Sequence, residues 1–391
     1  MPINIAKAAM MGAAGAGGES YWWIEETAAP LFSFGVDITS TGNVVCGLSF
    51  DILLFDPDGN RLWGTSVASS APRAPKFDTN GDVWTVDGPS ILKLNGSDGT
   101  ILLDKTITST GSPLTFITGP SGDMYLIGRT GIRGYVTKFN TSMVVQWSIE
   151  ITFSDLSYGP MYAITGSRLI WIDTWGGGGV WMAATDLGTG LVEHWKKGVG
   201  NVGSAMGTTA CPDGDVLFLH TKTSIYSVIV IKTDPSGTAP VNTWAKGLGY
   251  GVSTTIFRTA VAPNGDIFIL EDTTGVLVKL DSSGNILAEV TIGTFDTFDR
   301  NTQSIVADNN AVYISMSLSA SAKGVVKLPS ALSPVSFGAA QFTTTTTTTV
   351  SATTINQSYI AETQTWAATS DSVVNGSKVD SASGLVTTKY T

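Results

Sequence analysis

Charged residues are scarce in this sequence, and so are the side chains that carry most metal and acid–base chemistry. Charged residues make up 14% of the 391 positions, against roughly 25% in an ordinary soluble domain. The two histidines, His194 and His220, stand in no metal-ligand spacing, so a zinc or iron site is not expected. The two cysteines, Cys46 and Cys211, are too far apart in the sequence to indicate a disulfide framework, and we expect buried free thiols.

The sequence also lacks the segments and motifs that define several classes of protein. It has no run of about 18 apolar residues of the kind that spans a membrane, and no GxSxG, GxGxxG or GxxxxGK motif. The net charge is -10 and Lys and Arg form no stripe, so nucleic acid is not an expected partner and anionic membranes are disfavoured. We predict no catalytic, cofactor-binding or metal-binding residue, no cofactor, and a chain that is not an enzyme.

What the sequence does contain is a repeated turn followed by a short apolar run. Each copy places Gly, Asn, Asp or Ser before a stretch rich in Val, Ile, Tyr and Trp, which is typical of a hairpin turn leading into a strand. The seven copies are STGNVVCGL (40–48), TNGDVWTVD (79–87), PSGDMYLIG (120–128), ITGSRLIWI (164–172), PDGDVLFLH (212–220), PNGDIFILE (263–271) and DNNAVYISM (308–316).

A second motif, a strand, a tight turn and another strand, follows each copy of the first. The seven copies are ILLFDPDGNRLW (52–63), ILKLNGSDGTILL (91–103), YVTKFNTSMVVQW (135–147), MAATDLGTGLVEHW (182–195), VIVIKTDPSGTAPVNTW (228–244), VLVKLDSSGNILAE (276–289) and GVVKLPSALSPVSF (324–337). Four copies end in tryptophan, at Trp63, Trp147, Trp195 and Trp244. Together with an apolar approach strand such as PLTFITG (113–119), each unit has about four strands.

Four strands repeated roughly every 40 to 50 residues are typical of a propeller blade, and a closed ring of blades leaves no exposed sheet edge. No long segment has apolar residues at helical spacing. We therefore predict an all-β fold, a seven-bladed β-propeller of four-stranded blades over 20–340. An Ala/Gly-rich N-terminal extension (1–19) precedes it, and a Thr/Ser-rich C-terminal arm (341–391) follows it.

The ends of the chain carry separate expectations. SYWWIEE (20–26) is similar to the blade-closing strand QWSIEI (146–151), so it is expected to add to the last blade, although PVSF (334–337) could fill the same place. Residues 1–19 are interpreted as an extension that packs against another segment or a partner chain. The polar arm is interpreted as an extended segment ordered by contacts, with Ile355, Tyr359, Ile360 and Trp366 available as anchors against a neighbour.

The acidic turns are the best metal candidates, and they are DPDGN (56–60), DTNGD (78–82), DGD (213–215) and DSSGN (281–285). An EF-hand loop needs Gly at its sixth position and a closing Glu at its twelfth, and these turns supply neither. NTSM (140–143) and PSAL (329–332) occupy the same corner in other repeats, so Asp is interpreted as a turn residue that bonds its own backbone. Calcium remains the lesser alternative.

Aromatic residues and one glycine run are the other candidates for binding. Most aromatic side chains fall at repeating positions where packing between blades is expected, and these include Trp84, Tyr125, Trp171 and Tyr313. The exceptions that could mark an interface are Trp22, Trp23 and Trp175. The GGGG run (176–179) is interpreted as a flexible loop tip, with close approach of a ligand as the alternative.

The alternation of S-x-G-N/D-V-x-V with K-x-D/N-x-x-G-x-x-x-W resembles the SSGNVYVTG … KYNSSGTIQW repeats of bacterial and phage β-propeller proteins. The Ala/Gly-rich lead followed by YWW (21–23) is similar to the start of virion proteins of tailed bacteriophages. The resemblance covers about 10–340 and departs in blades four and five and in the Thr-rich tail. It implies a structural or receptor-facing part of the particle, usually tail-associated, with no catalytic residue to carry over.

Three functions remain as hypotheses. The first is a structural virion protein of the tail or fibre region, present in multiple copies, which docks to other virion proteins through its termini and could face a host receptor. The second is a secreted or surface propeller, located outside the cell, that binds glycan or protein through its loops. The third is a propeller enzyme such as a lyase, hydrolase or quinone-dependent dehydrogenase, which the few histidines disfavour.

Overall fold

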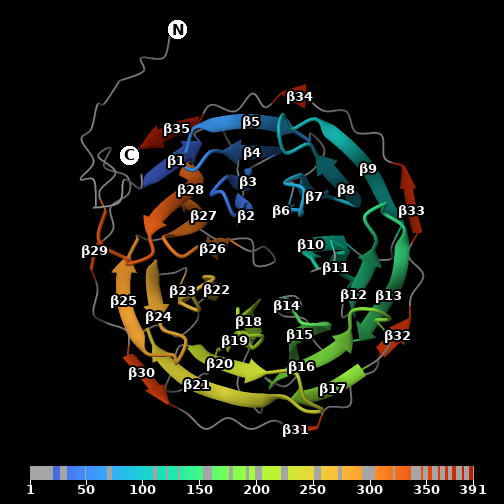
Figure 1. Ribbon diagram of the computed structural model, residues 1–391, viewed down its shortest axis with the longest axis vertical. Helices are drawn as coiled ribbons and strands as arrows, with labels where there is room; N and C mark the ends of the chain where they lie inside the picture. Colours follow the sequence, from blue (N-terminus) through green and yellow to red (C-terminus); the bar gives the residue numbers. More distant parts are fainter. Residues whose placement is uncertain are drawn as a thin grey trace.

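A computed structural model of the chain contains a closed ring of seven β-sheets around a central axis (Figure 1). The structure describes residues 21–26, 33–48, 50–67, 73–108, 112–119, 122–130, 133–152, 161–175, 179–190, 193–198, 205–221, 228–250, 257–271, 275–292, 304–319, 322–335, 345–346, 351–354, 360–361, 366–368, 372–375, 381–382 and 387–390. The N-terminal extension expected over 1–19 lies outside these residues.

Each sheet is a blade of four consecutive antiparallel strands, and the predicted seven-bladed β-propeller is confirmed. The blades, in chain order, are β2(Ser33–Ile38), β3(Val44–Leu48), β4(Asp51–Phe55), β5(Arg61–Ser66); β6(Arg73–Phe77), β7(Val83–Asp87), β8(Ser90–Leu94), β9(Ile101–Thr108); β10(Ser112–Thr118), β11(Met124–Thr130), β12(Arg133–Phe139), β13(Val145–Thr152); β14(Met161–Thr165), β15(Arg168–Trp175), β16(Gly179–Asp186), β17(Glu193–Gly198); β18(Ala205–Ala210), β19(Val216–His220), β20(Val228–Asp234), β21(Val241–Gly249); β22(Phe257–Val261), β23(Ile267–Glu271), β24(Val276–Leu280), β25(Ile286–Thr291); and β26(Ile305–Ala307), β27(Ala311–Ser319), β28(Ala322–Pro329), β1(Trp22–Glu26).

The first strand of every blade lies nearest the axis, and the fourth lies on the circumference (Figure 1). The turn-plus-strand motif of the sequence therefore forms the second strand from the axis, and the approach strand is the innermost one. Second strands such as β3, β7 and β23 are buried along their whole length because both faces of a blade pack against neighbouring blades. This explains why the sequence shows continuous apolar runs in place of apolar–polar alternation.

The core is divided into seven clusters, and each lies at the junction of two adjacent blades. At the junction of the last blade with the first, Trp22 and Tyr313 pack against Val44 and Phe55. Because alternate residues of a strand face opposite sides of its sheet, one strand contributes to two clusters. The ring is thus stabilised by blade-to-blade packing all the way round, including where its two ends meet.

The N-terminal strand β1 closes the ring, as the similarity of SYWWIEE to QWSIEI predicts. β1 pairs antiparallel with β28 in the register Trp22↔Lys327 to Glu26↔Lys323, so it is the fourth strand of the seventh blade. The alternative segment PVSF does not fill this place, because the described part of it (334–335) is not in a strand.

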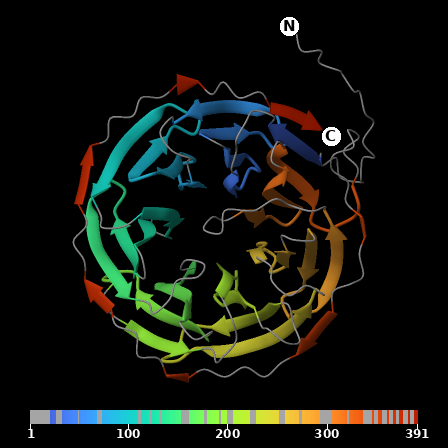
Figure 2. The same ribbon diagram turned by 180° about the vertical axis from the view of Figure 1, so that it is seen from behind.

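The C-terminal segment forms a fifth strand on every blade. We call the seven strands of residues 345–390 the strap, and they are β29(Thr345–Thr346), β30(Ser351–Thr354), β31(Ile360–Ala361), β32(Trp366–Ala368), β33(Ser372–Asn375), β34(Ser381–Ala382) and β35(Thr387–Tyr390). They pair with the outer strands of blades six, five, four, three, two, one and seven in that order. Figures 1 and 2 show the strap, in red, running round the outside of the ring.

The strap runs against the order of the blades for a physical reason. Strand twist accumulates across each blade, so that the fourth strands lie nearly along the circumference (Figure 2). A strand that pairs antiparallel with them must then travel the opposite way round the ring. Two of the anchors expected against a neighbour, Ile360 and Trp366, instead pair with Gly198 and Ile151 of this chain's own blades. The other two, Ile355 and Tyr359, lie outside the described residues.

Candidate functional site: acidic turns and blade junctions

In six of the seven blades, an Asp or Asn at the start of the hairpin turn binds the backbone of its own turn. In the first blade, Asp56 Oδ1 accepts hydrogen bonds from the backbone N–H of Asp58 (3.0 Å) and of Asn60 (2.8 Å). In the third blade, Asn140 takes the same role without a charge and accepts from Val144 N–H (2.9 Å). The interpretation of these residues as turn-forming corners is confirmed, because the geometry needs a short acceptor side chain and no charge.

A second set of Asp residues, those that directly precede the second strands, forms ion pairs with a lysine of the third strand. The lysine is the Cα partner of the second residue of the second strand, as in Trp84↔Lys93 and Tyr125↔Lys138. The pairs are Lys93–Asp82 (2.7 Å), Lys138–Asp123 (3.0 Å), Lys279–Asp266 (2.7 Å) and Lys232–Asp215 (3.8 Å). Lys232 also pairs with Asp213, two residues earlier in the same turn. The lysine ammonium also lies over the aromatic ring of the second strand where one is present, 5.3 Å from the centroid of Trp84.

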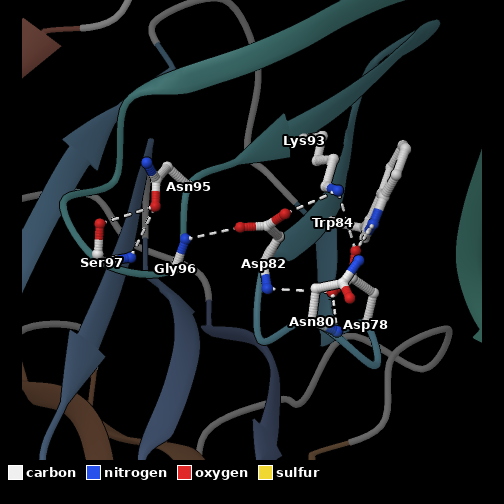
Figure 3. Close-up of polar contacts among 8 residues, drawn as sticks. All are labelled: Asp78, Asn80, Asp82, Trp84, Lys93, Asn95, Gly96 and Ser97. Carbon is white, nitrogen blue, oxygen red and sulfur yellow. Dashed lines mark hydrogen bonds and ion pairs between the residues drawn. The ribbon is translucent and has the colours of Figure 1, made fainter.

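The second blade has the fullest version of this cluster, and Figure 3 shows it. Lys93 Nζ lies 3.1 Å from Asp78 Oδ2 and 2.7 Å from Asp82 Oδ2. The Trp84 indole N–H donates to Asp78 Oδ2 (3.1 Å), and Gly96 N–H donates to Asp82 Oδ1 (3.2 Å). The turn of the first motif and the turn of the hairpin are thereby fixed to each other.

The charges of this cluster stabilise one another. Partial burial acts to raise the pKa of Asp78, but hydrogen bonds from Trp84, Lys93 and the Asn80 N–H outweigh it and hold that pKa below its ordinary value. Burial acts to lower the pKa of Lys93, and the hydrogen bonds to Asp82 and Asp78 outweigh it and raise that pKa. Both groups are therefore charged at neutral pH, and an ammonium occupies the position between the two carboxylates.

The metal candidates of the sequence fall into these two roles. The carboxylates of DTNGD (78–82) are bound by Lys93 and by backbone N–H groups, and those of DGD (213–215) face Lys232. In the turn 281–285, Asp281 accepts hydrogen bonds from its own turn backbone. Among the residues that the structure describes, no group of three or more His, Cys, Asp and Glu has the geometry to hold a metal ion.

Sequence reasoning missed a contact between each outer strand and the next blade. Four tryptophans of the outer strands donate their indole N–H to a backbone carbonyl in the hairpin turn of the following blade. The contacts are Trp22 to Pro57 O (3.0 Å), Trp63 to Gly96 O (2.9 Å), Trp147 to Gly188 O (3.1 Å) and Trp244 to Ser282 O (2.9 Å). Lysines reach the same turns at two junctions, where Lys138 donates to Leu187 O (3.0 Å) and Lys327 to Pro57 O (3.1 Å).

A glycine with positive φ lies against each of these indoles. A Cβ on Gly59 (φ 79°) would lie 2.7 Å from Trp22 Cδ2, and one on Gly99 (φ 76°) would lie 2.6 Å from Trp63 Cε3. A Cβ on Gly190 would lie 2.4 Å from Trp147 Cδ2, and one on Gly284 would lie 3.1 Å from Trp244 Cε3. The glycine is therefore required twice, for its backbone conformation and for the space that the indole fills.

At two junctions, other residues occupy the positions that are tryptophan and glycine elsewhere. The turn residue with positive φ is Met143 in the third blade (φ 61°) and Leu332 in the seventh (φ 53°), and both are buried. The outer-strand position that carries tryptophan elsewhere is Leu103 before Met143 and Ala288 before Leu332. Each pair belongs to one core cluster, so a large turn residue accompanies a smaller outer-strand residue.

The predictions for aromatic residues have mixed outcomes. Trp84, Tyr125, Trp171 and Tyr313 are buried at the blade junctions, as predicted. The prediction for Trp22 is wrong: its side chain is 0% exposed and packs against the first blade, so it forms no outer interface. The side chains of Trp23, Trp175 and Trp195 lie outside what the structure describes, as do residues 176–178 of the glycine run.

The prediction of buried free thiols is confirmed, and one of the two histidines is described. Cys46 and Cys211 are buried free thiols, and burial raises the pKa of Cys211 to about 12. His220 ends β19, is fully buried, and stacks on Phe218 with ring centroids 6.3 Å apart. The side chain of His194, near the start of β17, is outside the described set.

The two faces of the ring differ in their connections. The links from first to second and from third to fourth strands lie on one face, the turn face, and are short turns such as 39–43 and 281–285. The other strand ends lie on the opposite face, which we call the loop face, and the longest intervals between consecutive strands join strand ends there (153–160, 221–227 and 292–304), mostly outside the described residues.

Exposed large apolar side chains recur at one position of the outer strands. Leu62, Leu102 and Leu287 are each the second residue of their strand, next to the turn face, and are 52%, 52% and 55% exposed. Phe50, which is 48% exposed, lies on the loop face.

Comparison with known proteins supports the fold and no narrower grouping. No protein-family model and no curated protein matches the chain. Solved structures are similar to it: virginiamycin B lyase from Staphylococcus aureus aligns with a TM-score of 0.57 at 13% identity over 78% of this chain and 99% of the lyase. A chain of a mitotic checkpoint complex aligns with a TM-score of 0.56 at 12% identity over 83% of this chain and 100% of its own length. The WD40 propeller domain of Doa1 aligns with a TM-score of 0.52 at 9% identity over 78% and 96%. These likenesses place the chain in the class of β-propellers.

Over the part of the chain that the structure describes, no helix is long and apolar enough to cross a membrane.

Proposed function

We propose that the chain is a non-enzymatic structural protein of a virus particle, a tail or tail-fibre-region component present in multiple copies. The observation that carries the structural role is the use made of the recurring polar groups. The Asp, Lys and Trp residues that repeat from blade to blade bind one another or the backbone of the next blade. These interactions hold the turns and adjacent blades together, which is what a structural protein exposed to mechanical and thermal stress requires.

Other virion proteins are the proposed partners. The resemblance of the repeats and of the N-terminal lead to tailed-phage proteins supports this, and the leader (1–19) is the segment proposed to dock. The strap strands pair with the chain's own blades, so the C-terminal arm is not part of the proposed docking segment. The exposed leucines beside the turn face offer apolar contact area for a protein partner.

A secreted or surface propeller that binds glycan or protein is the second candidate. The observation that favours it is that the longest intervals between consecutive strands join strand ends on the loop face, where Phe50 is also exposed. Binding residues are disproportionately found on loops held by a rigid scaffold.

Mass spectrometry of purified particles tests the proposal. Particles banded on a density gradient are expected to contain peptides of this chain at a fixed ratio to the major structural proteins, through repeated banding and a high-salt wash. Recovery of the peptides only in the particle-free supernatant would overturn the virion assignment and favour the second candidate.

A further inference from the structure

The N-terminal strand β1 is held on both edges. It pairs through five residues with β28 and, on its other edge, in the register Trp23↔Tyr390 to Glu26↔Thr387, with the last strand of the strap. In the other blades the fourth strand follows the third directly through a hairpin turn, whereas β1 reaches its blade from the far end of the chain. Among the blade strands that the structure describes, β1 is therefore the one whose neighbour in the blade does not follow or precede it directly in the sequence.

The described side chains of β1 pack against the first blade. Trp22 and Ile24 are buried at the junction with the first blade, where Trp22 donates to Pro57 O. Without β35, the other edge of β1 would present unpaired N–H and C=O groups, and a short edge strand frays readily.

The strap reaches β1 only after a complete circuit. Its strands have two to four residues each, which makes each one weak alone. Successive strands begin six or nine residues apart, seven on average, and seven extended residues span about 23 Å. One such step carries the chain from blade to blade, so the pairing of each strand positions the next and brings β35 beside β1.

We propose that the strap acts as a clasp: its last strand, β35, pairs with β1 and holds it in the seventh blade, so that the ring stays closed. This is the one described blade whose fourth strand is not joined to its third strand by a hairpin turn. Because Tyr390 pairs with Trp23, both ends of the described chain leave the ring at one point beside the turn face. The clasp depends on the pairing of β1 with β35 and not on the proposed virion role.

Cysteine pairs in the full chain test the register. Glu25→Cys with Thr388→Cys places cysteines at directly opposed positions, whose Cα separation of roughly 4.5–5.5 Å permits a disulfide. The control combines Glu25→Cys with Ser372→Cys, a strap position that pairs with Thr108 in the second blade. Under native oxidation the first pair is expected to cross-link within the chain and the control is not. Equal yields for the two pairs, or no cross-link in the first, would overturn the clasp.

Hydrogen exchange tests the clasp itself. Replacing 385–391 by a Gly-Ser segment of the same length should raise exchange of the β1 amides about tenfold or more, while amides of β3 and β19 keep their protection. Should that variant fail to fold, the cross-linked full chain provides the second measurement, since oxidation should slow β1 exchange relative to its reduced form. Unchanged β1 exchange in either comparison contradicts the proposal.

Discussion

At the scale of single residues, one glycine of a hairpin turn and one tryptophan of the preceding blade act as a unit. Glycine is needed at such a turn either for its positive φ or for the space that an indole fills, and two residues distinguish these requirements. Gly59 and Gly81 both have positive φ, but only Gly59 lies under an indole. Gly81 has no heavy atom within 4 Å of the position that a Cβ would take.

Alanine at these two positions should therefore have different effects. Gly81→Ala is expected to lower the free energy of unfolding by about 1 kcal/mol through the unfavourable φ alone. Gly59→Ala should lower it by about 2–4 kcal/mol because Trp22 must also move. Denaturant unfolding of the two variants measures the difference, and equal losses would show that the indole does not fill this space.

The Asp78 cluster predicts a pH dependence of stability. The folded-state pKa of Asp78 lies below the unfolded value of 3.8, so its contribution is present above that pH and is lost as the pH falls through the folded pKa. Lys93, whose pKa is raised above 10.5, contributes below that pH and loses its contribution in strong alkali.

Asp78→Asn is expected to cost about 1–2 kcal/mol of unfolding free energy at pH 7. The difference from the unsubstituted protein should stay constant from about pH 5 to 9 and shrink below pH 3.8. Asp58→Asn, in an exposed turn position, is the matched control and should change little. A loss that is independent of pH down to pH 2 would assign the effect of Asp78→Asn to packing.

Single residues were only partly predictable from sequence. The Asp corners could be identified because substitutes such as Asn140 appear at the same place in other repeats. The lysine partners were visible as a recurring third-strand residue, but their pairing with Asp82 or Asp123 depends on register across a hairpin. Trp22 was misjudged because its partner Gly59 lies in another blade, and no local pattern links the two.

At the scale of elements, six of the seven blade junctions show a matched pair of residues among the side chains that the structure describes. Tryptophan accompanies glycine at Gly59, Gly99, Gly190 and Gly284, whereas Leu103 accompanies Met143. The junction of the second and third blades should therefore also accept a tryptophan in the outer strand with a glycine in the turn, in place of Leu103 and Met143.

Leu103→Trp alone should lower the unfolding free energy by about 1–3 kcal/mol, because Met143 already fills the space. Adding Met143→Gly to that variant should recover most of the loss, and Met143→Gly alone should destabilise by leaving a cavity. A double-mutant cycle by denaturant unfolding is expected to give a favourable coupling of about 1–3 kcal/mol. Additive effects would show that the two positions do not share one space.

The blade elements were predictable because the turn chemistry repeats, and seven aligned copies reveal what one copy hides. The strap was not predictable in the same way. Its strands are short and polar, so they lack the apolar alternation that marks a strand, and their pairing partners lie across the whole sequence. A signal exists in the spacing, since Ser351, Ser358, Thr365 and Ser372 recur every seven residues, but its meaning depends on knowing the circumference of the ring.

At the scale of the whole molecule, the strap covers the outer edge of every blade. Exposed outer strands are templates for pairing between molecules. The expectation that a closed ring leaves no exposed sheet edge is wrong, because the fourth strand of each blade has an outer edge that no other blade covers. The strap pairs with that edge in all seven blades.

Removal of residues 341–391 should therefore cause self-association more than unfolding. The truncated chain is expected to keep its β-sheet circular dichroism, because the four strands of each blade pair with one another and the described members of the seven core clusters come from the blades. It should associate at concentrations where the full chain does not, as measured by light scattering and sedimentation velocity. The control that lacks only 385–391 exposes one blade edge and should associate much less, and similar behaviour of the two truncations would contradict an edge-protecting role.

The junction pairs also determine what can be exchanged between propellers of this kind. A blade cut at its own boundaries carries the glycine of one junction and the tryptophan of the next, so its transfer would mismatch both. The portable module is offset by one strand: the outer strand of one blade together with the hairpin turn of the blade that follows. A designer who duplicates or shuffles repeats of this ring should place the cuts before the outer strand, for example ahead of Arg61, so that Trp63 and Gly99 travel together.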